Sequence, residues 1–164
     1  MMNDKQCDRV IGYYGDGFVS GAQYIKVEYI DMTLEAYIAN PAFPGKRSIS
    51  DIASQMLLCL KQMHIAGYIH QDVKPDNFMI SLNDHKVRIL DMGLVMEYMR
   101  DGAHKSLGKY GFQGTPHYGS MTGLYGYTLS RRDDLESLGY SIMCLIDRDQ
   151  VPWINTDNKE GILV

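Results

Sequence analysis

Two stretches of the chain repeat apolar residues at the three- and four-residue spacing of an amphipathic helix. The first begins at Ser48 and ends at Gly67, and the second begins at Ser130. Each start carries a Ser-x-x-Asp sequence, reaching Asp51 and Asp133, which is typical of a capping box. We expect the first helix to bury Ile49, Ile52, Ala53, Met56, Leu57, Leu60 and Met63. We expect the second helix to bury Leu135, Leu138, Gly139, Ile142 and Ile146.

Alternating apolar and polar residues near the start of the chain predict a β-hairpin. Its expected strands cover residues 9–14 and 22–29. The residues Gly15-Asp16-Gly17 and Ser20-Gly21 are turn formers, so we expect them to join the two strands.

Shorter elements are expected around the first long helix. Residues 33–39 predict a short helix capped by Asp31 or Thr33, and a loop with Pro41, Pro44 and Gly45 follows it. After the long helix, the apolar stretches 68–69, 78–80 and 87–90 favour small strands that frame a site built from loops. Residues 92–126 are rich in Gly and Tyr with little periodicity, and such a stretch in a compact chain is usually functional or disordered.

Length and composition describe one folded domain. The chain has 164 residues, of which 45% are hydrophobic and 22% are charged, close to the average of globular proteins. Sixteen Lys and Arg against twenty Asp and Glu give a formal net charge of -4, so there is no global basic field to hold nucleic acid or an anionic membrane. We therefore expect neither as a partner, and any anion site has to be local.

The cysteines and histidines lack the spacing of a structural metal site. Cys7, Cys59 and Cys144 are far apart without a Cys-x-x-Cys pair, which suits a reducing compartment, cytoplasmic or nuclear. Cys59 and Cys144 lie in apolar helical patterns, so we expect both in the core. No apolar run approaches the roughly 18 residues of a membrane span, and the first ten residues are too polar for a signal peptide.

A polar segment after the first long helix carries the residue types that phosphoryl transfer requires. This chemistry needs a carboxylate to accept or orient a hydroxyl proton, a cation to offset phosphate charge, and oxygen ligands for magnesium. Asp72 and Lys74 supply the first two roles, and Asn77 with Asp91 supplies the third. Taken alone, Asp72, Lys74 and Asn77 are also compatible with a solvated turn, because Asp, Asn and Pro are ordinary turn residues.

The chain resembles the eukaryotic protein kinases in two motifs, the catalytic loop His70-Gln71-Asp72-Val73-Lys74-Pro75-Asp76-Asn77 and the metal motif Asp91-Met92-Gly93. Two later segments narrow the resemblance to the casein kinase I family and its relatives, the vaccinia-related kinases. They are Gly114-Thr115-Pro116-His117-Tyr118-Gly119-Ser120 and Ser130-Arg131-Arg132-Asp133-Asp134-Leu135-Glu136-Ser137-Leu138-Gly139-Tyr140. The Pro152-Trp153 pair also matches that group, so the resemblance runs through nearly the whole chain.

The resemblance implies an α+β fold of protein-kinase type and the use of ATP and Mg²⁺. Residues 1–30 would be a remnant hairpin and hinge of the small N-lobe, and residues 31–164 a partial, mostly helical C-lobe. Val27 occupies the gatekeeper position of the hinge. The backbone groups of Glu28 and Ile30 would bind the adenine, and Lys74 would contact the phosphates.

The resemblance also implies supporting residues and a pocket for a protein substrate. Asp134 resembles the acid that hydrogen-bonds the catalytic loop from below, and we expect His70 to be a buried, hydrogen-bonded loop residue rather than a catalyst. Arg131 and Arg132 fall on the segment beside which the family receives an acidic or already phosphorylated stretch of substrate. They are also compatible with simple ion pairs on the helix surface.

The chain departs from the family pattern before the hairpin. The glycine-rich loop, the phosphate-pairing lysine and the glutamate that pairs with it belong there, and we expect all three to be absent. The glycines at 12, 15 and 17 are too close to the hinge to form that loop, so a hairpin turn is the better interpretation. Gln71 replaces the arginine that receives an activation-loop phosphate in many kinases, and Met92 replaces a phenylalanine.

Three functions are consistent with these residues. The first is a serine/threonine protein kinase segment of casein kinase I type, because the four catalytic positions are intact. The second is a pseudokinase or scaffold, since positioning of the triphosphate is most of phosphoryl-transfer catalysis and the small-lobe lysine is missing. The third is a small-molecule phosphotransferase, against which Lys74 and the Ser130 segment count. A truncated gene product is a further alternative.

Overall fold

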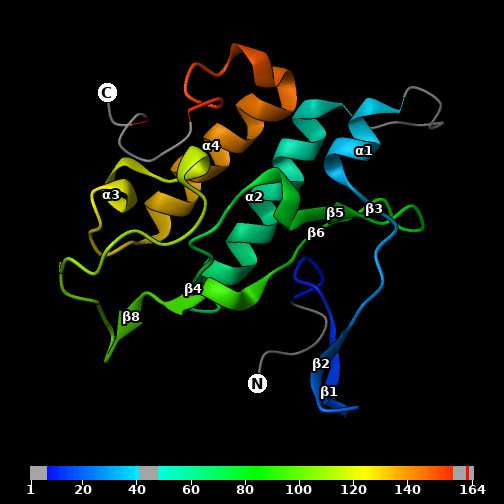
Figure 1. Ribbon diagram of the computed structural model, residues 1–164, viewed down its shortest axis with the longest axis horizontal. Coiled ribbons are helices and arrows are strands. Elements are labelled where there is room, and N and C mark those ends of the chain that lie inside the picture. Colours follow the sequence, from blue (N-terminus) through cyan, green and yellow to red (C-terminus); the bar gives the residue numbers. More distant parts are fainter. Residues whose placement is uncertain (1–6, 41–47, 157–161, 163–164) are drawn as a thin grey trace.

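A three-stranded antiparallel sheet and two long helices form the body of the molecule, a computed structural model that describes residues 7–40, 48–156 and 162 (Figure 1). The strands lie in the order β3 (Met32–Thr33), β5 (Phe78–Ile80) and β6 (Val87–Ile89). Helix α2 (Ile49–Ile65) contacts both β6 and helix α4 (Arg131–Asp147), so it lies between the sheet and α4. The mixture of helices and short sheets expected of an α+β fold is present in the described residues.

The starts of both long helices are capped as expected. Ser48 Oγ accepts a hydrogen bond from the backbone N–H of Asp51 at 3.2 Å. Ser130 donates its backbone N–H to Asp133 Oδ2 at 2.7 Å, which closes the capping box of α4. Helix α2 ends at Ile65, and Gly67 follows with a φ of 93°, a value that favours glycine. The helix boundaries predicted from the sequence are therefore confirmed.

The core lies where α2 meets the sheet and the inner face of α4. Its fully buried members include Leu34, Ile52, Met56, Cys59, Leu60, Phe78, Ile80, Val87 and Ile89. The expected burial of Cys59 and Cys144 is confirmed.

Helix α4 buries only part of the stripe that its apolar spacing predicted. Leu138 is buried and Ile142 packs against the core as expected, but Leu135 is 44% exposed, Ile146 is 65% exposed and Gly139 is exposed. Leu57 of α2 is likewise 48% exposed, so its expected burial was also wrong. The side that α4 turns inward also holds four polar residues, which are Asp133, Asp134, Ser137 and Ser141. Asp134 accepts backbone N–H groups of the 70–77 loop and Ser141 donates to the carbonyl of Val73, contacts that an apolar stripe cannot supply.

The hairpin is present, but its strands are displaced from the predicted ones. Strand β1 (Tyr13–Val19) pairs with β2 (Ala22–Val27) around a turn at Ser20 and Gly21 alone. Gly15 and Gly17 lie inside β1, with a bulge before Gly15, so placing them in the turn was wrong. A bulge accommodates a glycine with positive φ, and that of Gly15 is 131°. Figure 1 shows the hairpin extending away from the body of the molecule.

Short elements fill the remainder. Helix α1 (Leu34–Ala39) is capped by Thr33, whereas the predicted loop with Pro41, Pro44 and Gly45 lies outside the described residues. The irregular stretch contains β7 (Met96–Glu97), β8 (Met99–Arg100), β9 (Ala103–His104) and α3 (Met121–Leu124). Strand β4 (Tyr68–Ile69) pairs with β7, and single-turn 3-10 helices are η2 (Pro75–Asn77), η3 (Met92–Leu94), η4 (Pro116–Tyr118) and η5 (Arg148–Gln150). Within the described part of the chain, no helix is long and apolar enough to cross a membrane.

Candidate active site

The loop from His70 to Asn77 is held between two strands and the start of α4. It leaves β4, passes over the N-terminal end of α4 and enters β5 through η2. Strands β5 and β6 pair with Phe78 opposite Ile89, and Leu90 donates its N–H to the carbonyl of Asn77 at 2.9 Å. This antiparallel pairing places Asn77, just before β5, beside Asp91, which follows β6 closely.

The carboxylate of Asp72 is the centre of a compact hydrogen-bond network. Lys74 Nζ lies 2.9 Å from Asp72 Oδ2 and also donates to Thr115 Oγ1 at 2.9 Å. The backbone N–H of Thr115 donates to Asp72 Oδ1 at 2.8 Å. Asn77 Nδ2 donates to the carbonyl oxygen of Asp72 at 2.8 Å and to its Oδ2 at 3.3 Å. The structure therefore brings Asp72, Lys74 and Asn77 together, as the sequence predicted.

These contacts set the charge state of Asp72. Burial by itself would raise the pKa of this carboxyl, but the hydrogen bonds from Lys74 and Thr115 outweigh burial and hold the pKa below its ordinary value. The side chain is mostly buried and ionised at neutral pH. It is thus a hydrogen-bond acceptor held in a fixed position.

The loop conformation depends on a glycine from the later segment. Gly114 has a φ of 99°, and a Cβ on it would lie 2.6 Å from the carbonyl oxygen of Gln71. Only glycine therefore allows residues 114–115 to approach the loop. Gln71 itself has a φ of 68°, which is uncommon for a residue with a side chain, and its Nε2 donates to the carbonyl of Leu94.

Asp134 ties this loop to the start of α4. Its Oδ2 accepts the backbone N–H of His70 at 2.8 Å, and its Oδ1 accepts that of Gln71 at 2.9 Å. Oδ2 also lies 2.8 Å from Nε2 of His64, on α2. The Asp134 side chain is almost completely buried, so it holds two helices and the loop in one arrangement.

His70 is fully buried and uses both ring nitrogens. Nε2 donates to the carbonyl of Leu90 at 2.8 Å, and Nδ1 accepts the N–H of Asp72 at 3.3 Å. This pattern places the proton of the neutral ring on Nε2. His70 thus links the catalytic loop to the end of β6 and positions the backbone of Asp72.

Two oxygen-bearing side chains meet the chemical requirements of a hard cation. Asn77 Nδ2 donates to Asp72, so the amide oxygen is the atom of this side chain that remains for a cation. Asp91 is exposed, and its Oδ1 accepts the N–H of Gly93 at 3.2 Å. Asp91 has a φ of 60°, a conformation that occurs at functional sites when the surrounding structure enforces it. The described residues contain no cluster of three or more His, Cys, Asp or Glu side chains that could hold a metal.

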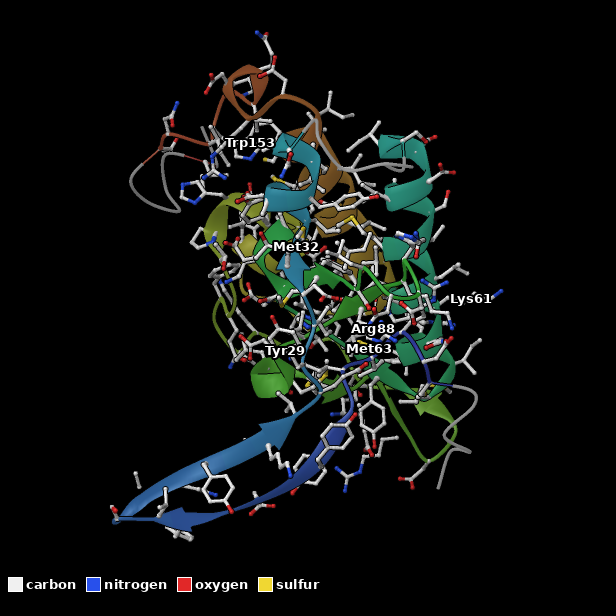
Figure 2. The ribbon with its side chains drawn as sticks, turned by 90° about the vertical axis from the view of Figure 1, so that its right-hand side faces the viewer. Tyr29, Met32, Lys61, Met63, Arg88 and Trp153 are labelled. Carbon is white, nitrogen blue, oxygen red and sulfur yellow. The ribbon has the colours of Figure 1, made fainter. Side chains whose placement is uncertain are left out.

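The predicted hinge follows the end of β2. Glu28 donates its N–H to the carbonyl of Gly12 at 2.7 Å, so its carbonyl is the backbone group that remains for a ligand. The side-chain oxygen Oε1 of Glu28 lies 3.3 Å from Nε of Arg88. Arg88, which is labelled in Figure 2, also forms an ion pair with Asp84 at 2.8 Å. Val27 is exposed, and Ile30 is buried.

The two arginines lie apart from this network. The guanidinium of Arg131 is 4.9 Å from the ring centroid of Tyr98, and Arg132 Nε is 3.8 Å from Asp133 Oδ2. Both line a groove between α2 and α4.

Comparison with known proteins decides the family. The model of the protein kinase domain matches residues 1–163. The chain belongs to the protein kinase family. This kinase is 29% identical over 151 residues to the "probable casein kinase I homolog" of Encephalitozoon cuniculi (strain GB-M1), a match that covers 90% of the chain and 47% of that relative. The structure of vaccinia related kinase 3 superposes with a TM-score of 0.81 at 23% identity over 96% of the chain and 51% of that structure. The kinase chain thus spans about half the length of the relatives that it matches.

Three contacts of the kinase site were not predicted from its sequence. Thr115 and Gly114 were noted only as part of a family segment, although they hold Asp72 and the loop backbone. His64 was placed on no site, because a single histidine near a helix end carries no sequence signal for a buried partner. Gly114 was the one detectable hint, since glycine is the usual residue where one backbone segment approaches another closely.

Proposed function

We propose that this chain is the catalytic part of a serine/threonine protein kinase of casein kinase I type, which transfers the γ-phosphate of ATP to a protein hydroxyl. The observation that carries the proposal is the Asp72 carboxylate, held by Lys74 and Thr115 beside Asn77. The name of the Encephalitozoon relative supports the choice of subfamily.

Asp72 orients the hydroxyl of the substrate. Its ionised carboxylate accepts the hydroxyl hydrogen, and its position is fixed because both of its oxygens are hydrogen-bonded. Lys74 lies within hydrogen-bond distance of Asp72 and Thr115, and its ammonium group is proposed to offset negative charge on the transferring phosphoryl group.

Asn77 and Asp91 are the proposed magnesium ligands. Their amide and carboxylate oxygens are the donors that Mg²⁺ prefers, and the β5–β6 pairing brings them to one edge of the sheet. When bound, the ion neutralises phosphate charge. The backbone of Glu28 and Ile30 is proposed to contact the adenine.

The proposed substrate is a protein segment that is acidic or already phosphorylated. Arg131 and Arg132 support this, because both are exposed cations at the N-terminal end of α4, where the positive end of the helix dipole also favours a bound anion. A phosphopeptide that binds wild type and an R131A/R132A double variant equally would contradict this assignment.

Thermal unfolding with ATP tests the nucleotide and metal assignment. We expect the Tm to rise more with ATP plus Mg²⁺ than with ATP alone, and Asp91→Asn to remove the metal-dependent increment. The control is Asp76→Asn, an exposed carboxylate in the same loop, which keeps the increment. An equal response with and without metal, or no response, would remove the ligand assignment.

Phosphate transfer tests the activity itself. The 164-residue chain is expected to phosphorylate a serine peptide very slowly, since the chain contains no glycine-rich loop or phosphate-pairing lysine before β1. The residual transfer should favour serine over tyrosine peptides and disappear in Asp72→Asn. Metal-dependent ATP binding without any transfer would instead favour a pseudokinase.

A further inference from the structure

A groove separate from the Asp72 network runs between the C-terminal half of α2 and the start of α4. Its volume is about 870 Å³. Its apolar lining comes from Leu57 and Ile65 of α2 and Leu135 of α4, which are 48%, 70% and 44% exposed. Leu57 and Ile65 are eight residues apart, so they lie on one face of the helix. These three side chains form an apolar floor that is open to solvent.

The rim of this groove is positively charged. Lys61 lies between Leu57 and Ile65 on the same face of α2, and Figure 2 shows its side chain extending away from the helix. Arg131 and Arg132 line the opposite side, and the Arg132 side chain is 72% exposed. None of the described residues that line the groove is acidic, although the chain as a whole carries a net charge of -4. The positive charge is thus a local property of this surface.

The neighbouring acids leave these cations available. Asp133 is the partner of Arg132 at 3.8 Å, but its oxygens already accept hydrogen bonds from Ser120 and Ser130. The Arg131 guanidinium lies 4.9 Å from the centroid of the Tyr98 ring, a contact that does not neutralise its charge. Both arginines therefore remain able to bind a carboxylate.

The combination of floor and rim defines the occupant. A free phosphate ion would use the cations and leave the apolar floor exposed, whereas a purely apolar segment would leave the cations without partners. We propose that this groove binds a short amphipathic segment of a partner protein, with apolar residues that enter the groove and acidic residues that pair with Lys61, Arg131 and Arg132. An amphipathic helix laid along α2 has this distribution.

The groove also contacts the support of the catalytic loop. His64 lines the groove, and its Nε2 lies 2.8 Å from Asp134 Oδ2, which accepts the N–H of His70. A bound segment would thus contact His64, which is connected to the catalytic loop through the carboxylate of Asp134. The groove shares Arg131 and Arg132 with the proposed substrate site, but Leu57 and Lys61 belong to the groove alone. Variants of these two residues therefore test the groove separately from substrate binding and from catalysis by Asp72.

Selection from a random 14-residue peptide display library against the immobilised chain tests the proposal. The enriched peptides should combine at least two acidic residues with apolar residues at three- or four-residue spacing. Fluorescence anisotropy of the best peptide should show affinity that falls as salt rises. We expect Lys61→Glu and Leu57→Ser each to weaken binding at least tenfold, and Asp72→Asn to leave it unchanged.

Matched controls lie outside the groove. Lys26→Glu on β2 and Leu107→Ser each change an exposed residue of the same type, and both should bind the peptide as wild type does. Enrichment of no peptide, or of peptides without acidic residues or without apolar ones, would overturn the proposal. Equal binding by the groove variants would also overturn it, as would equally strong competition by a single-stranded oligonucleotide, which would indicate a general polyanion site.

Discussion

Replacing Asp134 by asparagine should destabilise the whole chain, because one buried carboxylate holds the catalytic loop to both long helices. Asparagine keeps one oxygen for the N–H of either His70 or Gln71 and turns an NH₂ group toward the other. One buried hydrogen bond is then lost and the remaining one no longer involves a charge. From typical values for such bonds we expect a loss of about 2–4 kcal/mol in the free energy of unfolding.

For a chain of this size, that loss corresponds to a fall in Tm of about 5–15 °C. The assay is thermal and urea unfolding followed by circular dichroism. Asp101→Asn is the matched control, since this carboxylate is 95% exposed and its loss should change the Tm by no more than about 2 °C. Equal Tm values for the two variants would show that the Asp134 carboxylate does not stabilise the fold through the catalytic loop.

Three further outcomes follow from particular contacts. Gly114→Ala should unfold at a lower temperature than Gly102→Ala, since both have positive φ but only the Cβ at 114 meets backbone, and equal Tm values would contradict this. Because the folded pKa of Asp72 lies below the ordinary 3.8, its stabilisation is present above that value and is lost as pH falls through the folded pKa. In urea unfolding between pH 7 and 2.5, the free energy of unfolding should therefore fall less with acid in Lys74→Met than in wild type. Identical pH profiles of the two proteins would refute the pairing of Asp72 with Lys74. Burial raises the pKa of Cys59 to about 12, so a thiol reagent at pH 8 should modify it only upon unfolding, and rapid labelling of the folded protein would contradict its burial.

The sequence predicted those features of the fold that depend on local patterns. Capping at Ser48 and Ser130 and the β5 and β6 stretches are encoded by neighbouring residues, and the structure has them where expected. The bounds of the first hairpin strand were missed because a bulge allows a glycine inside a strand. From the sequence alone, Gly15 could not be distinguished from a turn residue.

Only the site residues that lie close together in the sequence, or at the ends of paired strands, were predicted. Asp72, Lys74 and Asn77 are close in the chain, so their proximity was readable, and Asp91 follows from the pairing of two short strands. Thr115 is 43 residues from Asp72 and His64 is 70 residues from Asp134, and no local pattern specifies such distant partners. The burial of Asp134 was likewise not predicted, since apolar periodicity does not show that a carboxylate at the start of α4 bonds the loop, although Leu138 of the expected stripe is buried.

The most direct test of the phosphoryl-transfer assignment is an ¹⁵N NMR spectrum of the chain with ATP and a trace of Mn²⁺ in place of Mg²⁺. Paramagnetic broadening should be strongest for the Asn77 side-chain amide and for the backbone amides of Asp91 and Gly93. It should disappear when excess Mg²⁺ displaces the Mn²⁺. Broadening centred elsewhere, or spread evenly over the acidic surface, would contradict the assignment of this loop as the metal–nucleotide site.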